Sequence, residues 1–547
     1  MSGRSARPQS WWNVADICEA IAAATPAHVA ISQGERRVTW TELNRRADGV
    51  AAALLHAGLE HQDRVALYLN NAPEYIESFV AATKASLVPV NTNFRYRDAE
   101  LAYLWNNADA AAVVFHGAFT ETAGRVRHNA PTVKQWIWVD DGTAECPDWA
   151  TPYETAAATP AVASPRPRST DDLIFLYTGG TTGMPKGVVF KQRQVLALPM
   201  RFAPTDLDVL IGELRQRGHG DTILIGPPLM HGTGMMAALQ ALLSGGTVSL
   251  LPSRRFDPLE LWDTAERDDA TQICIVGDAF ARPMLDALRT HRDRWKLQSL
   301  TRVISAGVMF SAPLKRGLMD LLPGLSILDQ LGSTENGTAG TCLSEPGTDV
   351  ETGTFDPTPG VRVIDSDNRD VQPGSGAVGR IAIPGGAVGY HKDPDRSAQT
   401  FVILDGRRYT VAGDFAIIES DGRVRLLGRG SQCINTGGEK VFAEEVEEVL
   451  KCHRDVKDAL VVGTPDDRFG EVVTAVVEAS ADVTDDQLIH HVKDALAAYK
   501  APKHIVRVDS LGRSPNGKAD YPAIRTLAVQ HLGAAADLSD EVKEQHR

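Results

Sequence analysis

The stretch Tyr177–Gly187, "YTGGTTGMPKG", contains four glycines, three threonines and one lysine. Glycines let backbone N–H groups approach an anion closely, and hydroxyls and a lysine add further donors. The run Asp172–Tyr177 before it is short and apolar, which is typical of a buried strand. Lys186 is followed by glycine instead of serine or threonine, so the Walker pattern is absent. The stretch predicts a different kind of phosphate loop, with a flexible surface loop as the alternative.

Length and composition describe an ordinary globular protein. A chain of 547 residues is too long for one core, so we expect at least two domains. The net charge of −14 argues against nonspecific nucleic-acid binding, although a local cluster of donors still suffices for an anionic ligand. Six cysteines without a C-x-x-C pair favour a reducing compartment and argue against a zinc site. With no signal-peptide core and no membrane-spanning apolar run, we expect a cytoplasmic protein without a transmembrane segment.

Strand and helix patterns alternate on both sides of an alanine- and proline-rich segment, residues 155–172, which we interpret as a linker. Before it, Thr39 and Glu42 fit a capping box at the start of a helix. A strand is predicted over residues 64–69 and a helix over residues 74–85. After it, the predicted strands begin at Thr222, Thr247, Gln272 and Arg302. This alternation predicts α/β layers with a largely parallel sheet.

The pattern changes after about Phe355. Short apolar runs separated by Gly, Asp and Pro predict hairpins or a small β-barrel. From Arg429 onward, helical and strand patterns mix in a compact region, which predicts a separate small α+β domain. We therefore expect one domain over residues 1–428 and a second over residues 429–547.

Four further stretches accompany the first: "LGSTE" (331–335), "YTVAGD" (409–414), "GRGSQCINTGGEKV" (428–441) and "SPNGK" (514–518). Together, in this order, they resemble the motifs of the adenylate-forming superfamily. That superfamily includes acyl-CoA synthetases, peptide-synthetase adenylation domains and firefly luciferase. The stretch "VNTNFRYRDAEL" (90–101) is closest to actinobacterial fatty acyl-CoA synthetases. The resemblance implies a large multi-layer N-terminal domain that binds AMP and the acyl group, and a smaller mobile C-terminal domain.

The resemblance implies the first half-reaction, in which a carboxylate attacks ATP and pyrophosphate leaves. Both reactants are anions, so cations and fixed donors must surround them. Glu335 matches a Mg²⁺ ligand, Thr334 an α-phosphate contact, and Lys518 the lysine that bridges carboxylate and α-phosphate. The implied ATP-binding residues are Thr178, Gly179, Gly180, Thr181, Thr182, Gly183 and Lys186 for the phosphates, Ala306, Gly307, Leu331 and Gly332 for the nucleotide, and Asp414 and Arg429 for the ribose. As isolated residues, Glu335 and Asp414 would be turn residues, and Lys518 a solvated surface lysine.

In the implied second half-reaction, a CoA thiol attacks the adenylate after the C-terminal domain has rotated. Gly438 matches the residue that lets the pantetheine arm pass, and Lys440 is a candidate for a CoA phosphate contact or a solvated lysine. His231 matches a position beside the carboxylate, with a structural histidine as the alternative. The small residues Gly232, Gly234, Ala237, Ala238, Gly277, Ala279, Ala306 and Gly307 leave volume for a bulky acid or serve helix packing. We expect a hydrophobic acid, either long-chain or of the sterol side-chain type.

Three positions depart from the family pattern. Leu331 replaces the aromatic residue that stacks on adenine, Ala412 replaces a threonine, and Ser431 occupies the hinge position. None of these changes removes a charge that the reaction needs. Competing functions are the loading of a free carrier protein, a luciferase-like oxygenase, and a non-catalytic sensor of acyl groups or nucleotide. The sequence leaves open the oligomeric state and any peripheral contact with a membrane.

Overall fold

The computed structural model describes residues 13–164, 167–180, 183–197, 207–348, 350–436, 439–466, 469–514 and 517–544. Thr181, Thr182 and Gly438, which the sequence assigned to phosphate and pantetheine binding, lie outside these residues. No helix in the described ranges is long and apolar enough to span a membrane.

The first sheet contains the phosphate-loop stretch. In the described residues, its eight strands run in the order β19-β9-β8-β4-β3-β5-β6-β7. The strands from β8 to β7 are parallel, whereas β9 is antiparallel to both β8 and β19. Their bounds are β3 Arg64–Tyr68, β4 Val88–Asn91, β5 Ala110–His116, β6 Gln135–Val139, β7 Thr151–Pro152, β8 Leu173–Gly180, β9 Gly183–Lys191 and β19 Gly389–Tyr390. The stretch is therefore a hairpin, in which Thr178 lies opposite Lys186.

The second sheet carries the four strands predicted after the linker. Strands β1, β11, β10, β12, β13 and β14 are parallel neighbours, and the pairs from β14–β15 onward to β20 are antiparallel. The bounds are β1 Val29–Gln33, β2 Arg36–Thr39, β10 Thr222–Ile225, β11 Thr247–Leu250, β12 Gln272–Ile275, β13 Arg302–Ala306, β14 Ser326–Ser333, β15 Gly337–Ser344, β16 Thr354–Pro357, β17 Arg362–Ile364, β18 Gly379–Pro384, β20 Phe401–Leu404, β21 Arg407–Thr410, β22 Asp414–Ile418 and β23 Val424–Arg429. The hairpins predicted after residue 355 form its antiparallel end.

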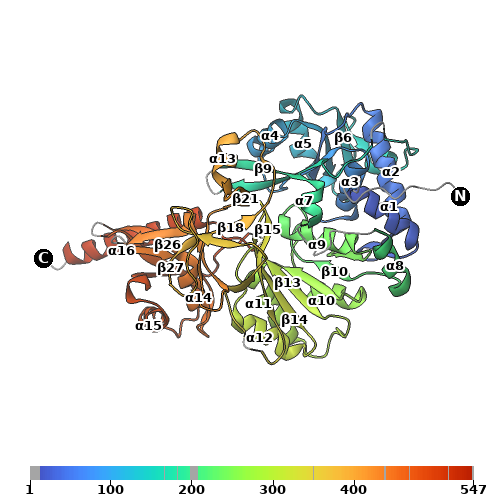
Figure 1. Ribbon diagram of the computed structural model, residues 1–547. Helices are drawn as coiled ribbons and strands as arrows, with labels where there is room; N and C mark the ends of the chain where they lie inside the picture. The colour runs from blue at the N-terminus through green and yellow to red at the C-terminus, as the bar shows by residue number, and fades with distance from the viewer. Residues whose placement is uncertain are drawn as a thin grey trace.

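The C-terminal part has a sheet of its own. It consists of β24 Cys433–Thr436, β25 Glu439–Phe442, β26 Val456–Asp466, β27 Gly470–Ala479 and β28 His504–Arg507. Helices α14 Ala443–Lys451, α15 Asp485–Ala495 and α16 Tyr521–Glu544 accompany it. This sheet and its helices lie at the left of the molecule in Figure 1, at the opposite end from the first helices of the chain.

Three apolar cores arrange the N-terminal part as alternating layers of helices and sheets. The largest core joins one face of the first sheet to one face of the second through α1 Val14–Ala24, α2 Trp40–His56, α3 Pro73–Lys84, α8 Leu207–Arg217 and α9 Gly232–Leu243. A second core packs α10 Pro258–Arg267, α11 Gly277–Thr290 and α12 Ala312–Leu321 on the second sheet (Figure 1). A third packs α4 Asp98–Asn107 and α5 Thr120–Val126 on the first sheet. The predicted large α/β domain with a smaller α+β part is confirmed.

Local signals explain several helix ends. Thr39 caps α2, because its hydroxyl accepts a hydrogen bond of 3.2 Å from the Glu42 amide. The predicted helix over residues 74–85 is α3, which begins at Pro73, where a proline is well tolerated. The linker prediction was wrong at its start, since residues 155–157 belong to α6 Tyr153–Ala157, where Ala156 and Ala157 are buried. The remaining helices are α7 Gln192–Ala197 and α13 Pro394–Thr400.

A buried ion pair supports β14, the strand that leads to Thr334 and Glu335. Lys315 of α12 is completely buried, and its Nζ lies 3.1 Å from Oδ2 of Asp329, which is also buried. The ammonium also donates to the Glu351 carbonyl at 3.2 Å and lies 5.6 Å from the centre of the Phe310 ring. The pair thus joins α12 to the strand beneath the predicted site.

Candidate active site

The phosphate hairpin presents a buried positive charge. Lys186 lies on β9, and its Nζ is buried without a hydrogen-bond partner among the described residues. A buried ammonium without a partner is costly, so its persistence in the fold points to a ligand that supplies negative oxygens. This observation supports the prediction that the hairpin binds phosphate. Gly179, Gly180 and Gly183 lie at the facing ends of β8 and β9.

Asn91, at the end of β4, connects this hairpin to the turn before α9. Its Nδ2 donates to the carbonyls of Tyr177, at 2.9 Å, and Met230, at 2.6 Å. Its Oδ1 accepts a hydrogen bond of 2.6 Å from the Tyr177 amide. Because Asn91 is buried, these bonds are shielded from competing water. A residue of the first sheet therefore fixes the backbone immediately before His231, the N-cap residue of α9.

His231, Thr334 and Gly307 meet at the carboxyl ends of the parallel strands. His231 precedes α9 at its N-cap position, and burial, the charge of Lys518 and then that of Arg95 lower its pKa to about 3. It is therefore neutral at pH 7. The Thr334 hydroxyl is 3.7 Å from the position that a Cβ on Gly232 would occupy, and the Thr233 hydroxyl is 3.4 Å from the corresponding position on Gly307. In parallel sheets, this edge is where ligands bind.

Glu335, Asp414 and Arg429 form the charged part of the site. Asp414 and Arg429 face each other on β22 and β23, with Arg429 Nε 3.1 Å from Asp414 Oδ1. Burial raises the pKa of Asp414, and the charge of Glu335 adds to this effect, whereas Arg429 opposes it. Asp414 raises the pKa of Arg429 in turn. Arg429 remains about half exposed, at 53%, so its guanidinium is accessible to a ligand.

The C-terminal part places Lys518 in this site. Burial lowers the pKa of Lys518. The positive charge of Arg429 lowers it further, whereas the negative charge of Glu335 opposes the shift. The same ammonium lowers the pKa of His231, so Lys518 interacts electrostatically with His231, Glu335 and Arg429. Gly517 holds the loop against α11: a Cβ there would lie only 3.0 Å from the Val276 carbonyl, and its φ of +73° favours glycine. Two separate sheets thus contribute to one cluster.

The other predicted residues lie on strands β13, β14 and β25. Leu331 is buried in an apolar cluster of the second sheet, and Gly332 lies against the Gly337 carbonyl at a register shift between β14 and β15. Ala306 ends β13 opposite Gln330. Lys440 lies on β25 opposite Asn435, and its side chain is outside what the structure describes.

Sequence reasoning missed two residues of the site. Besides Asn91, Tyr390 of β19 donates a hydrogen bond of 2.8 Å from its hydroxyl to Oε1 of Glu335. Both residues lie far along the chain from the residues they contact; Tyr390 lies outside the motifs, whereas Asn91 lies in the stretch at residues 90–101. Only the pairing of distant strands brings them to the site.

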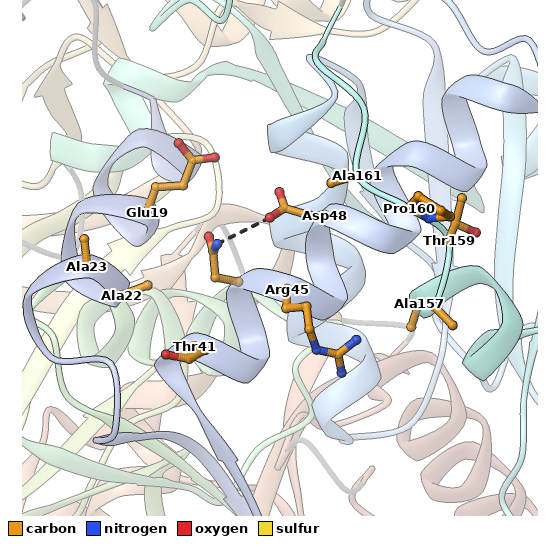
Figure 2. A pocket seen from close by; sticks show the side chains of 12 residues that line it. Glu19, Ala22, Ala23, Thr41, Arg45, Asp48, Ala157, Thr159, Pro160 and Ala161 are labelled. Atoms are coloured by element: carbon orange, nitrogen blue, oxygen red, sulfur yellow. Dashed lines mark hydrogen bonds between the residues drawn. The ribbon is translucent and has the colours of Figure 1, made fainter. Parts of the chain in front are cut away.

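A surface groove of about 590 Å³ lies elsewhere, between α1, α2 and residues 157–161 (Figure 2). Its polar lining includes Glu19, Arg45 and Asp48, and Glu19 and Asp48 both pair with the buried Lys84. None of the predicted site residues lines it.

Comparison with known proteins identifies the family. The model of the AMP-binding enzyme family matches residues 18–390, and that of the AMP-binding enzyme C-terminal domain matches residues 445–518. The chain is 38% identical over 535 residues to the 3-oxocholest-4-en-26-oate–CoA ligase of Rhodococcus rhodochrous, covering 93% of this chain and 94% of the relative. It is also 38% identical over 534 residues to the medium/long-chain-fatty-acid–CoA/3-oxocholest-4-en-26-oate–CoA ligase of Mycobacterium tuberculosis strain H37Rv, covering 93% and 95%.

A solved structure shares the fold. The anthranilate CoA ligase AuaEII in complex with anthranoyl-AMP superposes with a TM-score of 0.81 at 21% identity, over 96% of this chain and 98% of that chain. Both family models and the near full-length relatives identify the same family, and the solved structure has the same fold. The chain belongs to the AMP-binding enzyme family and, within it, to the adenylate-forming acyl-CoA synthetases.

Proposed function

We propose that this enzyme converts a hydrophobic carboxylic acid, ATP and CoA into acyl-CoA, AMP and pyrophosphate by way of an acyl-adenylate. One observation carries the proposal: Gly517, the residue before Lys518, packs against Val276 of the N-terminal part, and Lys518 interacts electrostatically with residues of that part. This arrangement combines positive charge for the reacting anions with a carboxylate suited to a metal ion.

In the first half-reaction, a carboxylate oxygen of the acid attacks the α-phosphorus of ATP, and the bond to the β-phosphate breaks. Lys518 neutralises the charge that the carboxylate and α-phosphate share, and the Thr334 hydroxyl contacts the α-phosphate. Thr178, Thr181, Thr182 and Lys186 hold the departing pyrophosphate. Asp414 accepts the ribose hydroxyls beside Arg429. His231, which is neutral, lies beside the carboxylate of the acid without adding charge.

Mg²⁺ fits this site. Glu335 would hold the ion together with phosphate oxygens of ATP, and the ion would neutralise phosphate charge. Mg²⁺ keeps several waters and commonly takes one or two carboxylates, so it needs no dense acidic cluster. The part of the chain that the structure describes contains no group of three or more His, Cys, Asp or Glu side chains suited to a metal ion. A single carboxylate with ATP oxygens agrees with that finding.

In the second half-reaction, the CoA thiol attacks the acyl carbonyl, and AMP leaves. We infer domains at residues 1–428 and 429–547 that move between the two steps, withdrawing Lys518. Gly438 gives the pantetheine arm a path, and Lys440 contacts a CoA phosphate. Both roles rest on the motif "GRGSQCINTGGEKV". We place the reaction in the cytoplasm, where ATP and CoA are both abundant.

The acid is a long-chain fatty acid or a sterol side-chain acid. Two near full-length relatives carry these acids in their names. The small residues after His231 on α9 pack tightly instead of opening space, because a Cβ on Gly234 would lie 2.5 Å from the Pro228 carbonyl and Ala237 and Ala238 belong to the largest apolar core.

Pyrophosphate release tests this proposal. We would measure it across straight-chain, branched, aryl and sterol-type acids, each with and without CoA, and analyse the acyl product. Release that depends on the acid and yields acyl-CoA supports the proposal and names the acid. Release that leaves acyl-adenylate unconverted by CoA indicates a carrier protein as the acceptor. Absence of release with every acid contradicts catalysis and favours a sensor.

Replacing Lys186 with methionine tests the phosphate hairpin. We expect ATP affinity to fall by about 10- to 100-fold, because a hydrogen bond from a charged donor is lost. Calorimetric titration with ATP measures the change. Lys191→Met is the matched control on the same strand, where the lysine pairs with Asp171 at 3.2 Å. Equal affinities of the two variants would contradict the role of Lys186.

A further inference from the structure

Residues 385–391 join the phosphate hairpin to Glu335. The amide of Val388 donates to the Val189 carbonyl at 2.7 Å, and that of His391 donates to the Gly187 carbonyl at 2.8 Å. The segment thereby pairs with β9 immediately after Lys186. At its other end, the Ala387 amide donates to the Glu335 carbonyl at 2.8 Å. The backbones of the predicted phosphate lysine and metal carboxylate are therefore both bonded to one short segment.

The segment passes very close to Glu335. A Cβ on Gly386 would lie 3.0 Å from the Glu335 carbonyl and would also meet the Thr410 hydroxyl. The φ of Gly386, +101°, is likewise one that residues with a side chain rarely adopt. Gln194 Nε2 donates to the Gly386 carbonyl at 2.5 Å, which attaches the segment to the residues after β9. This close approach requires glycine.

Tyr390 extends the connection to the carboxylate itself. Its hydroxyl donates to Glu335 Oε1 at 2.8 Å, and hydrogen bonds to an ionised acceptor are stronger than neutral ones. Tyr390 is itself held in place, because its amide donates to Ser397 Oγ at 2.8 Å and Arg396 lies 5.6 Å from the ring centre.

We propose that Tyr390 is a positioning residue, which holds one oxygen of Glu335 and so orients the carboxylate toward the metal ion that accompanies ATP. The segment 385–391 sets the separation between this carboxylate and Lys186. The inference deepens the proposed function and rests on it. Partners that orient metal ligands in this way commonly change metal affinity or activity by about 10- to 100-fold.

Metal-dependent ATP binding tests the role directly. ATP is titrated calorimetrically into the full chain at a series of Mg²⁺ concentrations and with the metal removed by a chelator. We expect Tyr390→Phe to raise the Mg²⁺ concentration for half-maximal enhancement of ATP binding by about tenfold. Binding of metal-free ATP should be unchanged, because Tyr390 acts through Glu335. In a Glu335→Gln background, Tyr390→Phe should have no further effect.

Tyr68→Phe is the matched control, because Tyr68 is buried in the first sheet, outside the site. Thermal unfolding of each variant checks that the fold is retained. If Tyr390→Phe does not fold, Ser397→Ala removes the anchor of the Tyr390 amide and should give the same metal-selective loss.

Three results would overturn the inference. The first is an unchanged Mg²⁺ requirement in Tyr390→Phe, and the second is an equal loss of binding with and without metal. The third is a full additional loss in the Glu335→Gln background. By contrast, a wild-type chain whose ATP binding ignores Mg²⁺ overturns the metal role in the proposed function as well as this inference.

Discussion

Replacing Lys518 with alanine is expected to lower the rate of acyl-adenylate formation by about 100- to 1,000-fold, because the reacting anions lose a fixed positive charge. Lys518 interacts electrostatically with His231, Glu335 and Arg429. The substitution should leave thioester formation from preformed acyl-adenylate largely intact, because the proposed domain movement would withdraw the lysine before the thiol attacks. Pyrophosphate release measures the first step, and acyl-CoA formation from synthetic acyl-adenylate measures the second.

Lys503→Ala is a suitable control for this prediction. Lys503 belongs to the same C-terminal part, and its side chain is 48% exposed, 3.6 Å from Asp466. Both half-reactions should proceed normally in this variant. A Lys518→Ala enzyme that lost both steps equally would contradict the assignment of Lys518 to adenylate formation.

The second large effect concerns stability. We expect Lys315→Met to destabilise the N-terminal part by about 3–5 kcal/mol, because it leaves Asp329 as a buried carboxylate without its ion-pair partner. The double variant Lys315→Met/Asp329→Leu should recover most of this loss, since apolar groups can replace a buried ion pair at little cost. Urea unfolding monitored by circular dichroism compares the three proteins. Equal destabilisation of the single and double variants would show that the ion pair itself is unimportant.

The loss of stability in the Lys315→Met variant should also depend on pH. Burial raises the pKa of Asp329, and Lys315 opposes the rise, so removing the lysine raises that pKa further. A carboxyl whose pKa is higher in the folded state than in the unfolded state hardly lowers the stability at a pH below its unfolded pKa, because it is then protonated in both states. The cost grows as pH rises toward the folded pKa. The variant should therefore approach wild-type stability below about pH 4, near the unfolded pKa of Asp, and lose progressively more stability, relative to wild type, as pH rises above that value.

Much of the fold followed from patterns within single segments. The runs beginning at Thr222, Thr247, Gln272 and Arg302 are apolar because both faces of a parallel sheet are covered, and each forms the predicted strand. Strand order was not accessible from such local patterns. The neighbours β8 and β4, or β9 and β19, are separated by long stretches of chain, and tertiary packing selects their pairing.

For the site, the motifs identified side chains that the fold then brings together. Glu335 lies in the turn between β14 and β15 and Lys518 in the loop between β28 and α16, yet each stood in a motif that could be identified locally. Tyr390 could not be found in that way, because a tyrosine in a strand is unremarkable until its partner is known, and the stretch at residues 90–101 does not reveal the partners of Asn91. Their signal lies in two hydrogen bonds across sheets, at 2.8 Å to Glu335 and 2.6 Å to Met230.

The hydrogen bonds of Asn91 suggest how the specificity for the carboxylic acid could be changed. The turn before His231 is fastened to the first sheet by Asn91 and also by Asn71, whose Oδ1 accepts from the Leu229 amide at 2.7 Å. A substitution behind either asparagine should move the turn before His231, and with it one side of the proposed acid site, without replacing His231 itself. Laboratory evolution toward new acids should therefore randomise β4 and the residues after β3 together with α9.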